Sequence, residues 1–245
     1  MYTDQAPAAL TNDFLVTQKW EEYETEQHSV WSLLYSRRME SLRTTASRAW
    51  LEGAATIGLR LDVVPDLTLL NSRLEKRTGW NAVAVSGFIP APEFFRMLSV
   101  RRFPTTITVR KRERLDYVPE PDIFHDVFGH VPLHAHPVFA DFLQRFGALA
   151  TRAKSDEATE RMARLFWFTV EFGLIRENGE IKVYGSGLIS SADDARNALG
   201  PDCDRRPFRL DDVLEQPFRI DELQEVLFII DSWDQLFEAL TAAGG

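Results

Sequence analysis

Residues 119–137 read PEPDIFHDVFGHVPLHAHP, and this stretch decides how the rest of the chain is interpreted. Four of the five histidines of the chain lie within it, namely His125, His130, His134 and His136. Histidines gathered beside carboxylates are typical of metal sites. The alternative interpretation is a solvated, histidine-rich turn.

The spacing of these histidines separates ligand candidates from bystanders. His130 and His134 have the four-residue spacing of a helical metal pair, but Pro132 between them would break such a helix. We therefore expect His134 and His136 to be structural residues of an exposed loop.

His125 and His130 are five residues apart, about 140° around an ideal α-helix, so one straight helix cannot aim both at one ion. They can converge if the helix ends near Gly129 and the chain turns there, which suits a glycine. We expect this turn, with both imidazoles as metal ligands.

A carboxylate in apolar surroundings supplies the third candidate ligand. Glu171 lies in LFWFTVEFGLI (165–175), within a helix that the pattern predicts over residues 157–175. Its neighbours three and four residues away are all apolar: Trp167, Phe168, Leu174 and Ile175. An unpaired buried carboxylate would cost several kcal/mol, so Glu171 needs a cation. A metal held by His125 and His130 supplies one; an arginine from elsewhere in the chain is the alternative.

Two imidazoles and one carboxylate form the facial triad of non-haem Fe(II) oxygenases, which leaves open positions on the metal. The same ligands could hold catalytic zinc, and the chain would then be a hydrolase. No additional general base stands out near the ligands, which argues against the hydrolase. A non-catalytic binding module is a third class, but a binder has no need of an open-sided triad.

Composition places the chain among ordinary globular proteins, with 245 residues, 44% hydrophobic and 27% charged. A net charge of −9 argues against a broad surface for nucleic acid or an anionic membrane. Cys203 is the single cysteine, and neither a signal peptide nor a membrane-spanning apolar run is evident. We expect a cytoplasmic protein.

Helical patterning dominates the chain, so we expect a mainly α (α+β) fold with a few short strands. Residues 1–25 are expected to form a flexible N-terminal arm, and residues 26–245 a single domain. The predicted helices cover about 27–55, 66–74, 92–98, 122–129, 138–152, 157–175, 192–199 and 233–242. The predicted strands cover about 82–86, 103–109 and 181–184.

Four segments resemble the aromatic amino acid hydroxylase family. They are YVPEPDIFHDVFGHVPL (117–133), FWFTVEFGLI (166–175), KVYGSGLISS (182–191) and HSVWSLLYSRR (28–38). The likeness runs from about residue 20 to about residue 200, and it is strongest to the short bacterial members that act on phenylalanine. It implies a catalytic domain with iron in a basket of helices, the iron bound by His125, His130 and Glu171.

The resemblance also implies the reaction and its cofactors. L-Phenylalanine would be hydroxylated to L-tyrosine by O2 at a non-haem Fe(II), with tetrahydrobiopterin or a related tetrahydropterin as electron donor. The phenylalanine is the only partner expected, since neither nucleic acid nor membrane is implied and the chain is expected to be a monomer.

The segment SGFIPAPEF (86–94) matches the loop and ring on which the family binds its pterin. The residues implied are Gly87, Phe88, Ile89, Ala91 and Phe94, with Phe94 as the stacking ring, together with Asp126 and Phe166. Some relatives carry Ser or Arg in this loop, where this chain has Pro90, Ala91 and Pro92, so backbone contacts are implied here. The alternative for Phe94 is a place in the core.

The resemblance gives Arg110 as the partner of the substrate carboxylate, held by Asp122, and a bidentate guanidinium suits that role. The alternative for Arg110 is a solvated place in the charge run RKRER (110–114). The remaining pocket residues implied are Tyr117, Val118, Pro121, Trp167, Gly187 and Ser190. Tryptophan-directed relatives carry Phe at the position of Trp167, which argues against tryptophan as the substrate.

Overall fold

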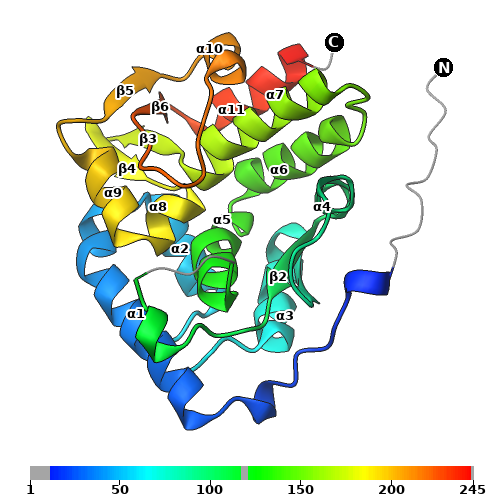
Figure 1. The fold of residues 1–245 in the computed structure, drawn as a ribbon, viewed down its shortest axis with the longest axis vertical. Coiled ribbons are helices and arrows are strands. Elements are labelled where there is room, and N and C mark those ends of the chain that lie inside the picture. The colour runs from blue at the N-terminus through cyan, green and yellow to red at the C-terminus, as the bar shows by residue number, and fades with distance from the viewer. Residues whose placement is uncertain (1–11, 117–120, 244–245) are drawn as a thin grey trace.

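The computed structural model describes residues 12–116 and 121–243 (Figure 1). Helices predominate and the strands are short, which confirms the expected fold class. The α-helices are α1 Thr25–Thr45, α2 Arg48–Ile57, α3 Leu67–Thr78, α4 Ala91–Ser99, α5 Val131–His134, α6 Pro137–Ala150, α7 Asp156–Phe166, α8 Ser186–Ser190, α9 Ala192–Leu199, α10 Leu210–Glu215 and α11 Trp233–Ala243. Two π-helices, η4 Phe124–His130 and η5 Trp167–Glu171, interrupt this series. Short 3-10 turns cover Asn12–Phe14, Trp20–Glu22 and Arg112–Arg114.

The single long helix expected over residues 27–55 is two helices, α1 and α2. Ser47 separates them, because its side chain accepts a hydrogen bond from the backbone N–H of Trp50 at 3.2 Å and so caps α2. The Ser47 N–H meanwhile donates to the carbonyl of Val183. The expected helix after Asp66 is confirmed as α3, whose buried face carries Leu67, Leu70 and Leu74.

Two small sheets lie on opposite sides of the helices (Figure 1). β1 (Asn81–Val85) pairs in parallel with β2 (Arg102–Thr106), and α4 connects the two strands. The second sheet has the order β4-β3-β6-β5, made of β3 Leu174–Glu177, β4 Glu180–Val183, β5 Asp204–Pro207 and β6 Val226–Ile230. Strand β6 was not predicted, and Leu174 and Ile175, expected in a helix, belong to β3.

Aromatic rings fill the core around the histidine-bearing segment. Phe124 and Phe128 of η4 stack on each other with ring centroids 4.5 Å apart. Trp31 of α1 and Trp50 of α2 meet these rings edge-on. The segment that carries His125 and His130 is therefore held from several sides by helices of the N-terminal half.

Residues 12–25, part of the expected free arm, run along the domain. The N–H of Val16 donates to the carbonyl of Ala84, and the N–H of Ser86 donates to the carbonyl of Phe14. Residues 1–11 lie outside the described residues. Within the described ranges, no helix has both the length and the apolar character needed to cross a membrane.

Candidate metal centre

A π-helix brings the first two predicted ligands together. In such a helix each turn closes between residues five apart, so residues at this spacing share one face. His125 and His130 occupy positions of that kind in η4, and their ring centroids lie 5.1 Å apart. The prediction that the helix ends in a turn near Gly129 was wrong, because the helix continues directly into α5. Pro132 does not break it, since it falls in the first turn of α5, where a missing N–H is tolerated.

Glu171 reaches the same point from η5, which follows α7 without a break. A hydrogen bond of 2.8 Å from the N–H of Phe172 to the carbonyl of Trp167 closes the wide turn at its end. Glu171 Oε1 lies 3.2 Å from Nε2 of His130, and Oε2 lies 3.7 Å from Nε2 of His125. The three potential ligand atoms all lie within 4.8 Å of one another, the one such group found among the described residues.

Positive charge beside the buried Glu171 carboxylate keeps it ionised. Burial by itself would raise the pKa of Glu171, but the positive charge and hydrogen bond of His130, with smaller contributions from His125 and Ser186, lower it to about 2. Within the described ranges no lysine or arginine forms an ion pair with this carboxylate, so the arginine alternative is not supported. Two imidazole nitrogens and a carboxylate oxygen fit Fe(II) or Zn(II) equally in donor type.

The short helix α8 supports two of the three ligands. Ser186 donates a hydrogen bond to Oε2 of Glu171 at 2.6 Å, and Ser190 Oγ lies 2.9 Å from Nδ1 of His125. Ser190 has one hydroxyl proton and donates it to the Ser186 carbonyl at 2.8 Å. His125 Nδ1 must then be the donor to Ser190, which leaves Nε2 with its lone pair facing the metal position.

Ser186 was missed in the sequence, although it lies within the quoted segment KVYGSGLISS. Its approach to η4 depends on Gly129, where a Cβ atom would come within 3.1 Å of Ser186. The signal in the sequence was therefore the pair of small residues Gly129 and Ser186, which lets the backbones of η4 and α8 approach closely.

Arg110 and Asp122 form a buried, bidentate pair. Arg110 Nε and Nη2 each donate to the carboxylate at 2.8 Å, and Nη1 donates to the carbonyl of Leu115. The two side chains are only 7% and 4% exposed, so the solvated alternative for Arg110 was wrong. Asp122 also accepts from the backbone N–H of His125 at 3.1 Å, which links this pair to the metal cluster.

Trp167 and Gly187 both lie against Phe172, the residue that follows Glu171. The indole stacks on Phe218 at 4.6 Å and lies against Phe172 at 4.7 Å. A Cβ atom at Gly187 would come within 3.0 Å of the Phe172 ring and 3.1 Å of the Glu171 carbonyl. Pro121 is exposed, while Tyr117 and Val118 lie outside the described residues.

The predicted pterin residues lie partly beside the cluster. The ring of Phe94 meets that of Phe166 at 5.4 Å, and Phe166 stacks over His130 at 6.5 Å. Phe94 is half-buried and also touches Phe103, so it contributes to the core as well. The loop before α4 holds the remaining predicted members: Gly87, Phe88, Ile89 and Ala91. In this loop Phe88 is 91% exposed and Ile89 is buried.

Asp126 is hydrogen-bonded to β2. Its Oδ2 accepts hydrogen bonds of 2.7 Å from both the backbone N–H and the hydroxyl of Thr106. Burial raises the pKa of this carboxyl, which the histidine charges and the Thr106 bonds only partly offset.

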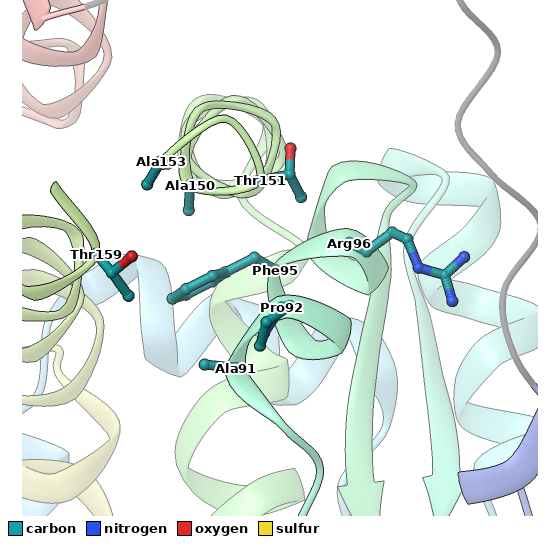
Figure 2. A pocket seen from close by; sticks show the side chains of 8 residues that line it. All are labelled: Ala91, Pro92, Phe95, Arg96, Ala150, Thr151, Ala153 and Thr159. Atoms are coloured by element: carbon teal, nitrogen blue, oxygen red, sulfur yellow. The ribbon is translucent and has the colours of Figure 1, made fainter. Parts of the chain in front are cut away.

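A cavity of about 280 Å³ lies apart from the metal cluster, between α4, the end of α6 and α7 (Figure 2). Its lining consists of Ala91, Pro92, Phe95, Arg96, Ala150, Thr151, Ala153 and Thr159. The Phe95 ring extends across it toward Thr159 (Figure 2). Ala91 is the one member shared with the predicted site, so this cavity adjoins the predicted pterin loop from outside.

The exposed loop expected for His134 and His136 is not found, because His134 lies in α5 and His136 in the short, half-buried connection between α5 and α6; neither belongs to the cluster. His134 is 1% exposed and stacks on Trp80, and neither ring nitrogen has a hydrogen-bond partner among the described residues. His136 precedes α6, and its Nδ1 accepts from the N–H of Phe139 at 3.4 Å. Both positions follow from the helix that continues past Gly129.

Comparisons with known proteins give the same picture. The family model of biopterin-dependent aromatic amino acid hydroxylases matches residues 13–243. The phenylalanine-4-hydroxylase of Chromobacterium violaceum is 45% identical over 180 residues, 74% of this chain and 61% of that protein. The phenylalanine-4-hydroxylase of Mesorhizobium japonicum is 41% identical over 233 residues, 94% of this chain and 84% of that protein. The chain therefore belongs to the biopterin-dependent aromatic amino acid hydroxylases.

A solved structure supports the fold independently. The Chromobacterium violaceum phenylalanine hydroxylase crystallised with iron(III) and the oxidised cofactor 7,8-dihydrobiopterin matches with a TM-score of 0.90 and 42% sequence identity. The match covers 95% of this chain and 85% of that chain.

Proposed function

We propose that the protein is a phenylalanine 4-monooxygenase, which hydroxylates L-phenylalanine to L-tyrosine with O2 and a tetrahydropterin at a non-haem Fe(II). The observation that carries the proposal is the cluster of His125, His130 and Glu171 in a chain of this family. The curated relatives named above are phenylalanine-4-hydroxylases, which favours phenylalanine among the aromatic amino acids.

The chain's own residues would prepare the metal site. His125, His130 and Glu171 would hold Fe(II), which together with the reduced pterin supplies activation of O2 for transfer of one oxygen atom to the para carbon of the ring. Ser190 keeps the proton of His125 on Nδ1, and Ser186 orients the Glu171 carboxylate. Phe103 and Phe166 pack beside His130 and would limit access of water to that ligand.

In this proposal Arg110 binds the substrate carboxylate. Three of its five N–H groups are engaged by Asp122 and Leu115, which leaves one N–H on each terminal nitrogen for a ligand. Asp122 fixes the plane of the guanidinium, so a planar carboxylate can be received by two parallel hydrogen bonds. The proposed pocket for the ring is completed by Tyr117, Val118, Pro121, Trp167, Gly187 and Ser190.

The pterin would lie between the loop before α4 and the rings that approach His130. Phe94 offers the stacking surface and Phe166 continues it toward the metal, which the ring contacts between them support. The backbone of the loop and the side chain of Asp126 complete the proposed site, whose loop members are Gly87, Phe88, Ile89 and Ala91.

We also propose that the protein acts as a monomer in the cytoplasm. Light scattering after size-exclusion chromatography tests the first statement, and cell fractionation tests the second.

The decisive experiment is product identification. Protein purified without oxygen and loaded with Fe(II) is given phenylalanine, O2 and synthetic tetrahydropterin, and parallel reactions contain tyrosine or tryptophan. Tyrosine formed from phenylalanine, dependent on both iron and pterin, supports the proposal. Faster consumption of another amino acid would overturn the substrate, and activity with zinc alone would overturn the reaction class.

A further inference from the structure

Gln224 is a buried amide whose hydrogen-bonding groups are all engaged. It is 6% exposed and lies just before β6. Its side-chain N–H groups donate to the carbonyls of Arg219 and Glu222 at 2.7 and 2.8 Å. Its side-chain oxygen accepts from Nε1 of Trp167 at 3.0 Å. This network also fixes which side of the amide is oxygen, because an N–H facing the indole N–H would leave two donors opposed.

The same glutamine joins a loop to the wall of the proposed pocket. Residues 216–225 form the loop between α10 and β6, and Phe218 from this loop stacks on the indole of Trp167. Gln224 closes the loop upon itself through the two carbonyls and ties it to that indole at its polar edge. The ring of Trp167 is thus held on a face by Phe218 and at its N–H by Gln224.

We propose that Gln224 is a positioning residue that sets the selectivity of the enzyme among aromatic amino acids. The inference rests on the proposed function, in which Trp167 is a wall of the ring pocket. A half-buried indole N–H needs an acceptor, and Gln224 provides the one that keeps the ring in its observed orientation. Without that acceptor the indole turns toward another partner, and the pocket loses the wall that discriminates between a benzene ring and a larger ring.

The main test is Gln224→Met, which keeps the side-chain length but removes the acceptor for Trp167 together with the two donors to the loop. We expect kcat/KM for phenylalanine relative to tryptophan to fall by about three- to tenfold, the range expected for one neutral hydrogen bond. The KM for the tetrahydropterin should stay within about twofold of wild type. An unchanged ratio in a folded Met variant would overturn the inference.

A double-mutant cycle shows whether the effect passes through the indole. In a Trp167→Phe background there is no indole N–H, so Gln224→Met should change the ratio no further. A change as large as in the wild-type background would mean that Gln224 acts by another route, and the inference would fail.

Asn197→Ala is the matched control for general loosening. Asn197 donates to the backbone carbonyl of Gln224 at 2.8 Å and makes no contact with Trp167 that the structure records. It should lower the melting temperature without moving the ratio of the two substrates; an equal shift of the ratio would reduce Gln224 to a structural role.

Gln224→Glu provides a second test if the Met variant does not fold. Its buried carboxyl would face the carbonyls of Arg219 and Glu222, which favours the protonated form, so its O–H replaces one donor while its other oxygen accepts from Trp167. Its substrate ratio should stay near wild type, and a shift like that expected for Met would contradict the inference. If wild-type enzyme forms no tyrosine from phenylalanine, the proposed function fails; if it does and the ratio is insensitive to Gln224, only this inference fails.

Discussion

Replacing Arg110 with Lys tests the proposed substrate pose directly. The positive charge remains, but the planar fork that Asp122 holds at two points of 2.8 Å is lost. A lysine ammonium can offer the substrate carboxylate one flexible hydrogen bond where the guanidinium offers two. One charged hydrogen bond is worth about 1.5–3 kcal/mol, so kcat/KM for phenylalanine should fall by about 10- to 150-fold.

Steady-state kinetics with iron-loaded protein measures this loss. The KM for the pterin and the iron content should stay near wild type, because Arg110 is assigned to neither. Phenethylamine, which lacks the carboxylate, should lose little further in the variant. Arg112→Lys is the matched control, since Arg112 belongs to the same charge run but is 45% exposed.

One outcome would refute the reasoning, and a second would show that the substitution acts through the metal site. If Arg110→Lys handles phenylalanine as wild type does, the carboxylate is bound by another group. If the variant loses iron together with activity, the substitution has disturbed the metal site through Asp122, which accepts a hydrogen bond from the backbone of His125. The loss of activity then gives no support to Arg110 as the partner of the substrate carboxylate.

The other predictions concern the metal, the pterin, the ring pocket and a buried imidazole. Glu171→Gln should leave the fold intact but weaken Fe(II) binding in a chelator competition, because the anionic ligand is lost; full iron retention with full turnover would contradict the triad. Phe94→Ala should raise the KM for the pterin more than the KM for phenylalanine, since a lost stack is worth about 0.5–1.5 kcal/mol, and an equal rise in both would count against this placement. Trp167→Phe should shift preference toward tryptophan in competition assays, and an unchanged ratio would mean that another residue sets the pocket size. His134→Leu should raise the free energy of unfolding by about 1–3 kcal/mol without altering iron content, because it removes an unpaired buried imidazole. Burial holds the pKa of His134 well below its ordinary value of 6.5, so the unfolded chain alone gains this proton as the pH falls. Wild-type stability should therefore decrease below about pH 6.5 by up to about 1.4 kcal/mol per pH unit from this group, and the Leu variant should lose that part of the slope in denaturant titrations.

The cluster of His125, His130 and Glu171 could be predicted because the chemistry of Glu171 conflicts with its surroundings. Glu171 is an anion among apolar residues, and the structure gives it two imidazoles as neighbours. The route by which His125 and His130 meet could not be predicted, because a π-helix leaves no distinct hydrophobic period in seven residues. The wrong expectation that His134 is exposed had the same cause, since it assumed that the helix ends near Gly129.

Strand β6 was missed for a different reason. It pairs in parallel with β3 on one side and β5 on the other, and four of its five residues are buried. Its sequence VLFII therefore shows no alternation, and a short apolar run of this kind is compatible with several structures. The hairpin between β3 and β4 has the Asn178–Gly179 turn, whose residues both have positive φ, as a tight hairpin requires.

The π-helix η4 has a consequence for protein design. A designer who grafts the pair of histidines with its spacing onto a regular α-helix would point the two imidazoles about 140° apart, and no ion would be bound by both. The transferable unit is a length of irregular backbone together with the glycine that lets α8 approach it. A scaffold search for this chemistry should therefore select hosts by the wide helical turn first and add the ligands afterwards.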